Sequence, residues 1–206
     1  NRARTYLTQD GLGPVLVKSV GGSAGVAMLG MAFTFLLGWQ LARGLGAAGY
    51  GVYGVAMAVV SILGIPSQFG LPQLLTREVA STNATRNWSQ LKGVIRWALR
   101  LAIVSSLTVV LLISGWIVFA GPGLTSALGR SLAIGAFLVP LIALGALSAA
   151  ILRGLLAVVI AQVPDGLVRP AAHSLLLVGM ALLGATLTPA SAMGAGVAGA
   201  ACALLV

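Results

Sequence analysis

Long apolar runs separated by short polar connections fill almost the whole sequence. Each run approaches the roughly 20 residues that a helix needs to cross the hydrocarbon core of a bilayer. There are six such runs, at residues 15–41, 50–71, 97–120, 131–152, 168–187 and 190–206. The pattern therefore predicts an all-α, polytopic membrane protein with six transmembrane helices.

Composition supports this prediction. The chain is 59% hydrophobic and only 7% charged, whereas a soluble domain carries roughly 25% charged residues. Its 28 glycines suit membrane helices, in which small residues let backbones approach closely. The single cysteine, Cys202, lies in an apolar run and is interpreted as a packing residue. Because the chain begins at Asn1 and ends inside an apolar run, we expect a piece of a longer protein.

Basic residues predict the orientation. Ten of the twelve lysines and arginines lie on one side of the six-span arrangement and two on the other. Because basic residues gather on the cytoplasmic side, we predict a cytoplasmic N-terminus and a multi-pass topology. The inner set is Arg2, Arg4, Lys18, Arg77, Arg86, Lys92, Arg96, Arg100, Arg153 and Arg169, and the outer set is Arg43 and Arg130.

The stretch GYGVYG, residues 49–54, matches the G-x-G-x-x-G pattern of dinucleotide-binding turns. That pattern has this meaning only after a strand and with an acidic residue about 20 positions further on. Neither is present, and the stretch lies at the outer turn between the first two predicted spans, where it overlaps the start of the second. We therefore interpret it as a glycine turn on the outer side, flanked by Tyr50 and Tyr53 as interfacial aromatics, and expect no nucleotide cofactor.

Residues 76–96 form the richest polar connection. Lys92, Arg96 and Arg100 recur every four residues, which predicts an amphipathic lead-in to the third span at the anionic inner leaflet. The alternative is a set of snorkelling anchors with no further role.

Catalytic patterns are nearly absent. The chain has one His, one Cys and three acids, and it lacks HExxH, CxxC and G-x-S-x-G. We therefore expect no catalytic residue, metal site or cofactor, and no nucleic-acid partner.

Two polar groups are candidates for a binding site. Arg77 and Glu78 follow a span that Pro66 and Pro72 interrupt. A broken helix is tolerated at membrane depth where it lines protein or a water-filled cavity. The pair therefore either faces a cavity or forms a loop ion pair that ends the helix.

The second group is Asp165, Arg169 and His173, spaced by four residues. They share one face if the helix is continuous, although Pro170 is expected to kink it. Ionisable residues inside a span are costly and point to function. Alternatively, Asp165 and Arg169 form a local pair at the inner surface, and His173 is a hydrogen-bonded packing residue.

Three stretches together resemble the polysaccharide biosynthesis (Wzx-like) flippases, in the superfamily of the MATE exporters and the lipid II flippase. They are LARGLGAAGYGVYGVAMAV, FGLPQLLTREVA and ILRGLLAVVIAQVPDGLVRP, in this order along the chain. The resemblance implies that residues 1–206 are the N-terminal, six-helix lobe of a two-lobe MATE-like transporter whose second lobe is missing here.

The resemblance also implies a cargo, an undecaprenyl-pyrophosphate-linked oligosaccharide that crosses the bacterial inner membrane by alternating access. A polysaccharide polymerase and a ligase are candidate partners, beside the bilayer itself. The alternatives are a MATE-like cation-coupled multidrug exporter, which needs a buried acid that the middles of the predicted spans lack, and a non-transport membrane enzyme or scaffold. The candidate cavity or gate residues are Arg43, Arg77, Glu78, Arg153, Asp165, Arg169 and His173.

Overall fold

The computed structural model describes residues 9–85, 87–119 and 121–206, and throughout this part every regular element is a helix. The prediction of an all-helical chain is thus confirmed. Three stretches are long and apolar enough to cross a membrane, Gly21–Ser67, Trp88–Phe119 and Ala127–Gly154, and Pro189–Leu204 is a shorter apolar helix. The elements are α1 (Gln9–Ser67), α2 (Leu71–Ala84), α3 (Trp88–Phe119), α4 (Ala127–Ala136), α5 (Leu138–Gly154), α6 (Val158–Val163), η2 (Pro164–Val168), α7 (Arg169–Leu182) and α8 (Pro189–Leu204).

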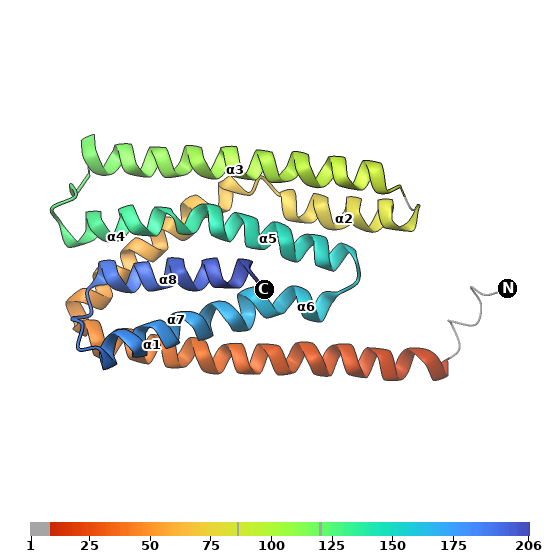
Figure 1. Cartoon of the computed structure of the whole chain (residues 1–206), viewed down its shortest axis with the longest axis horizontal. Coiled ribbons are helices and arrows are strands. Elements are labelled where there is room, and N and C mark those ends of the chain that lie inside the picture. Colours follow the sequence, from red (N-terminus) through yellow and green to blue (C-terminus); the bar gives the residue numbers. More distant parts are fainter. Residues whose placement is uncertain (1–8, 86, 120) are drawn as a thin grey trace.

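Helix α1 is broken at Gly46 into two arms. Gly46 has φ 66° and ψ 176°, a conformation that is essentially restricted to glycine. There the chain turns back, so that residues 9–45 form a first arm and residues 47–67 form a second arm (Figure 1). Residues 49–54 are helical and belong to the second arm. The interpretation of GYGVYG as the turn itself was therefore wrong, because one glycine at positive φ completes the reversal.

The connections between helices gather at two ends of the molecule. The break at Gly46, the α3–α4 connection and the α7–α8 connection lie together at the left of Figure 1. The α2–α3 and α5–α6 connections lie at the other end. The connections predicted to be outer thus share one end, and those predicted to be inner share the opposite end.

A second break separates α1 from α2. Phe69 and Gly70 have φ 45° and φ 68°, so the helix stops at Ser67 and restarts at Leu71. Ser105 of α3 donates its hydroxyl to the carbonyl of Ser67 at 2.6 Å, and both residues are buried. A neighbouring hydroxyl thus satisfies a carbonyl that the break has freed, which is how broken helices persist inside membranes.

The main core lies where the second arm of α1 meets α3, α4, α5 and α8. Ala56 and Val60, one helical turn apart, are fully buried in it. Because they hold one face of the second arm in the core, the adjacent face with Tyr53 and Met57 is directed toward α7, where both residues line a cavity. The largest fully buried side chains of this core are Ile117, Leu132, Leu138 and Met193.

Candidate functional site

The segment α6–η2–α7 runs without interruption from Val158 to Leu182. Its helix thus begins ten residues before the predicted span of 168–187. Pro170 was expected to kink it, but the chain instead forms a π-helical turn, in which the amide of Arg169 donates to the carbonyl of Pro164. A π-helical turn inside an α-helix is uncommon and frequent at functional sites. Asp165, Arg169 and His173 therefore lie on one continuous helical segment.

The turn also explains a backbone contact with α1. Pro170 has no amide hydrogen, so the carbonyl of Gly166 lacks its usual partner four residues on. That carbonyl lies against Gly30, where an added Cβ would overlap its oxygen. Gly30 is buried, so the first arm of α1 and η2 pack backbone to backbone.

A cavity of about 230 Å³ lies between the two arms of α1 and the η2–α7 segment. Gly30, Thr34, Leu37 and Leu41 follow helical spacing on the first arm, and the middle two line the cavity. The structure therefore brings Asp165, Arg169 and His173 to one site. The lining residues are Thr34, Leu37, Tyr53, Met57, Asp165, Arg169, Pro170 and His173.

Thr34 and Tyr53 are polar lining residues that the sequence analysis did not assign to the site. Tyr53 was interpreted as an interfacial aromatic, but it is half-buried and lines the cavity. Thr34 donates its hydroxyl to the carbonyl of Gly30 at 2.8 Å. The sequence feature that could have identified them is that both are polar residues inside otherwise apolar runs.

Within the cavity, the two charged side chains differ in exposure. Arg169 is half-buried and Asp165 is exposed. Both carboxylate oxygens of Asp165 lie 3.5 Å from the position that a Cβ at Gly145 of α5 would take. Asp165 therefore extends toward α5, and glycine at position 145 leaves room for it.

His173 is a packing residue as well as a lining residue. It is buried, and its Nε2 lies 3.1 Å from the carbonyl oxygen of Ala192 in α8. Since a carbonyl only accepts, Nε2 carries the proton in this contact. A Cβ at Gly196 would lie 3.1 Å from the ring, and one at Gly199 would lie 3.3 Å from the histidine Cβ. The ring thus occupies a space that the glycines of α8 leave open.

Arg77 and Glu78 lie elsewhere. Both belong to the body of α2, which continues to Ala84, so they do not end a helix in a loop as one alternative proposed. Arg77 is exposed and Glu78 half-buried. Helix α2 packs against α3 and α5 and makes no extensive contact with α7 in the described chain. Arg77 and Arg169 are therefore not brought to one site in this conformation.

Arg43 and Arg153 lie near opposite ends of the molecule. The Arg43 guanidinium carbon is 5.4 Å from the centroid of the Trp39 ring, a cation–π contact. Arg153, in the last turn of α5, is exposed and donates from Nε to the carbonyl of Ala149 at 3.1 Å. Neither residue lines the 230 Å³ cavity.

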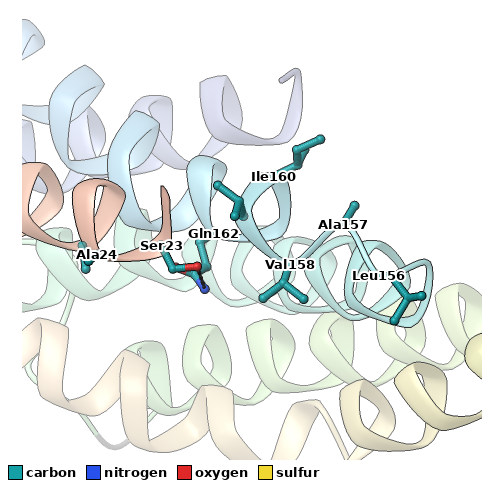
Figure 2. A pocket seen from close by; sticks show the side chains of 9 residues that line it. Ser23, Ala24, Leu156, Ala157, Val158, Ile160 and Gln162 are labelled. Atoms are coloured by element: carbon teal, nitrogen blue, oxygen red, sulfur yellow. Dashed lines mark hydrogen bonds between the residues drawn. The ribbon is translucent and has the colours of Figure 1, made fainter. Parts of the chain in front are cut away.

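A larger groove of about 740 Å³ lies between α1 and α6 (Figure 2). Its lining is mainly aliphatic, and Gln162 donates to Ser23 there at 3.5 Å. Figure 2 shows these two side chains close together. Among the residues whose side chains the structure describes, those that line this groove are uncharged, whereas the smaller cavity has charged groups in its wall.

The cavity combines one guanidinium, one carboxylate, one imidazole and two hydroxyl groups among apolar helices. An arginine fork matches the oxygens of a phosphate or pyrophosphate. Among the described residues, no group of three His, Cys, Asp or Glu side chains is placed to hold a metal ion. The guanidinium of Arg169 gives the cavity a group that can hold an anion.

Comparison with known proteins assigns the chain to a family. The family model described as "Polysaccharide biosynthesis protein" matches residues 16–204. No curated protein and no solved structure is significantly similar to the chain. The match covers nearly all of the helices described above, including every residue that lines the polar cavity. The chain therefore belongs to the polysaccharide biosynthesis protein family.

Proposed function

We propose that this chain is the N-terminal, six-span lobe of a flippase that moves an undecaprenyl-pyrophosphate-linked oligosaccharide from the inner to the outer leaflet of the bacterial inner membrane. Membership of the family supports a role in making or exporting polysaccharide. The observation that carries the proposal is Arg169, half-buried in a polar cavity between apolar helices. Arg169 was counted on the inner side, but it lies near the middle of the helical segment 158–182. An arginine at mid-helix in a membrane costs about 2.5–3.5 kcal/mol on insertion scales, so a functional role is the default hypothesis for it.

The arrangement of the helices supports six crossings. The first arm of α1, its second arm continued by α2, the helix α3, the pair α4–α5 and the segment α6–η2–α7 run lengthwise along the bundle, and α8 starts at the end that holds the Gly46 break and ends partway along it (Figure 1). With the basic excess on the cytoplasmic side, the N-terminus is cytoplasmic and the break at Gly46 lies outside.

Size indicates which part of the cargo the cavity accepts. Its volume of about 230 Å³ is below the roughly 300–1,000 Å³ of pockets for drug-sized ligands. It holds a charged headgroup, whereas the sugars need the larger space that a second lobe would enclose. The prenyl chain stays in lipid, the solvent that its apolar surface prefers.

Arg169 is the residue that binds the pyrophosphate in this mechanism. Asp165, one helical turn away, partly neutralises the guanidinium while the site is empty. An arriving anion makes a direct contact with Arg169 that the empty site lacks. That contact differs between empty and loaded states, which is the requirement for a ligand to bias a two-state transporter.

The test is restoration of surface polysaccharide in a strain that lacks its own flippase, using the full-length protein. Arg169→Ala should abolish export at normal membrane abundance, and Arg169→Lys should restore only part of it because lysine lacks the bidentate fork. Arg130→Ala is the matched control, since Arg130 is an exposed arginine outside the cavity. Full export by Arg169→Ala at normal abundance would rule out this arginine as a cargo ligand.

A cation-coupled exporter is the second candidate, and one observation favours it. Asp165 was placed before the fifth predicted span, but it lies inside the helical segment 158–182 and lines the cavity. Such an exporter needs an acid at this depth. Two results together would favour the exporter. The full-length protein would confer drug resistance that Asp165→Asn removes, and the unsubstituted protein would fail to restore surface polysaccharide.

A further inference from the structure

The first half of α3 presents a face that is basic and exposed. Lys92, Arg96 and Arg100 are all exposed, and their spacing of four residues places them on one side of the helix. The opposite side, with Leu91 and Ala98, is buried against α2 and α5. Helix α3 contains no acidic residue. We call the surface formed by Lys92, Arg96 and Arg100 the basic face.

Helix length places the basic face at the depth of lipid headgroups. Helix α3 has 32 residues, which at about 1.5 Å per residue span roughly 48 Å. Residues 101–119 carry no charge, and they span roughly 28 Å, close to the ~30 Å of the hydrocarbon core. With this segment in the core, Arg100 lies at its boundary, and Arg96 and Lys92 lie about 6 Å and 12 Å beyond Arg100.

Two tryptophans support the same depth. Trp88 and Trp97 are 56% and 53% exposed and lie on the same half of α3. Exposed tryptophans concentrate at the membrane–water interface because the ring is apolar and its N–H is polar. The basic face therefore lies among headgroup phosphates on the side predicted to be cytoplasmic.

We propose that the basic face binds the phosphates of anionic phospholipids in the inner leaflet. One cation in contact with a lipid headgroup favours an anionic lipid by roughly fivefold, and the arginine forks match phosphate oxygens. Simple snorkelling would place the same charges in water without selecting anionic over zwitterionic lipids. The inference does not depend on the proposed transport function, because it rests on the surface of α3 alone.

The experiment uses Trp97 as a reporter of the neighbouring lipid. The protein, with Trp39, Trp88 and Trp116 replaced by Phe, is reconstituted in bilayers that contain brominated phosphatidylglycerol or brominated phosphatidylcholine. Fluorescence quenching gives the relative affinity of the two lipids. We expect phosphatidylglycerol to be preferred about three- to tenfold at low salt and less at high salt.

Charge variants separate binding from structural damage. R96Q/R100Q should lower the preference to below twofold, and R96K/R100K should keep more than half of it. Arg153→Gln removes one charge near the α5–α6 connection, at the same end of the molecule, and should leave the preference unchanged. A parent preference near one, or the same preference in R96Q/R100Q, would overturn the proposal, as would equal losses in the Gln and Lys variants. Full displacement of phosphatidylglycerol by 1 mol% undecaprenyl pyrophosphate would assign the face to cargo and also overturn it.

Discussion

The contact between Gly30 and the carbonyl of Gly166 gives the sharpest structural prediction. Gly30→Ala places a methyl group where the first arm of α1 meets the π-helical turn. The added Cβ would overlap the carbonyl oxygen and lie 3.1 Å from the carbonyl carbon, against about 3.5–4.0 Å for an ordinary carbon–carbon contact. The neighbour is backbone, so no side-chain rotation relieves the overlap, and α1 must move away from η2.

The magnitude follows from a comparison with Gly38→Ala in the same arm. Alanine is favoured over glycine in a helix by about 1 kcal/mol, and this contribution to stability is the same in both variants. Nothing lies within 4 Å of a Cβ at Gly38, so the difference between the variants isolates the cost of overpacking, about 1–3 kcal/mol. At roughly 2–4 °C per kcal/mol for a chain of this size, Gly30→Ala should unfold about 2–12 °C below Gly38→Ala.

The assay is the apparent unfolding temperature of the two purified variants in one detergent at one heating rate. Surface polysaccharide in the complementation strain is measured alongside. We expect Gly30→Ala to lower both the unfolding temperature and the export of polysaccharide, because displacement of α1 moves Thr34 and Leu37, which line the cavity. Equal unfolding temperatures of the two variants would refute the close backbone approach and the account of the π-helical turn built on it.

Two further predictions concern the broken helix and the topology. Ser105→Ala leaves the buried carbonyl of Ser67 without its partner, so it should cost about 1–3 kcal/mol. Thr108→Ala, which removes an exposed bond within α3, should cost less, and equal unfolding temperatures would contradict this reasoning. For the six-span topology, reporter fusions should show three outer and two inner sites, and reversal at any two of them would exclude it. The outer sites are Ala48, Gly123 and Pro189, and the inner sites are Ala84 and Ala157.

Much of the architecture depends on residues that are close in the sequence, so it was predictable from the sequence. Apolar runs and scarce charges indicate helices in a lipid solvent, because hydropathy and helical periodicity depend on neighbouring residues alone. The interruption near Pro66 and the basic spacing of Lys92, Arg96 and Arg100 are equally local. The structure has a break at Ser67–Leu71 and an exposed basic face on α3.

The candidate site was only partly predictable. Asp165, Arg169 and His173 share a local spacing, and they do line one cavity. Arg77 was a candidate cavity residue as well, but it does not line this cavity, because α2 packs on α3 and α5. Tyr53 reaches the cavity because the distant core around Val60 holds its arm of α1.

The sequence by itself determined the helical class, the lipid environment and the polar residues that a site could use. The tertiary structure decided which of those residues meet. It placed the chain reversal at Gly46, converted the expected kink at Pro170 into a π-helical turn, and joined Thr34 and Tyr53 to residues more than 100 positions away. The physical reason is that these choices depend on close contacts between helices, such as Gly30 with Gly166 and Gly196 with His173. Such contacts arise from the packing of distant backbones, which no local pattern of residues encodes.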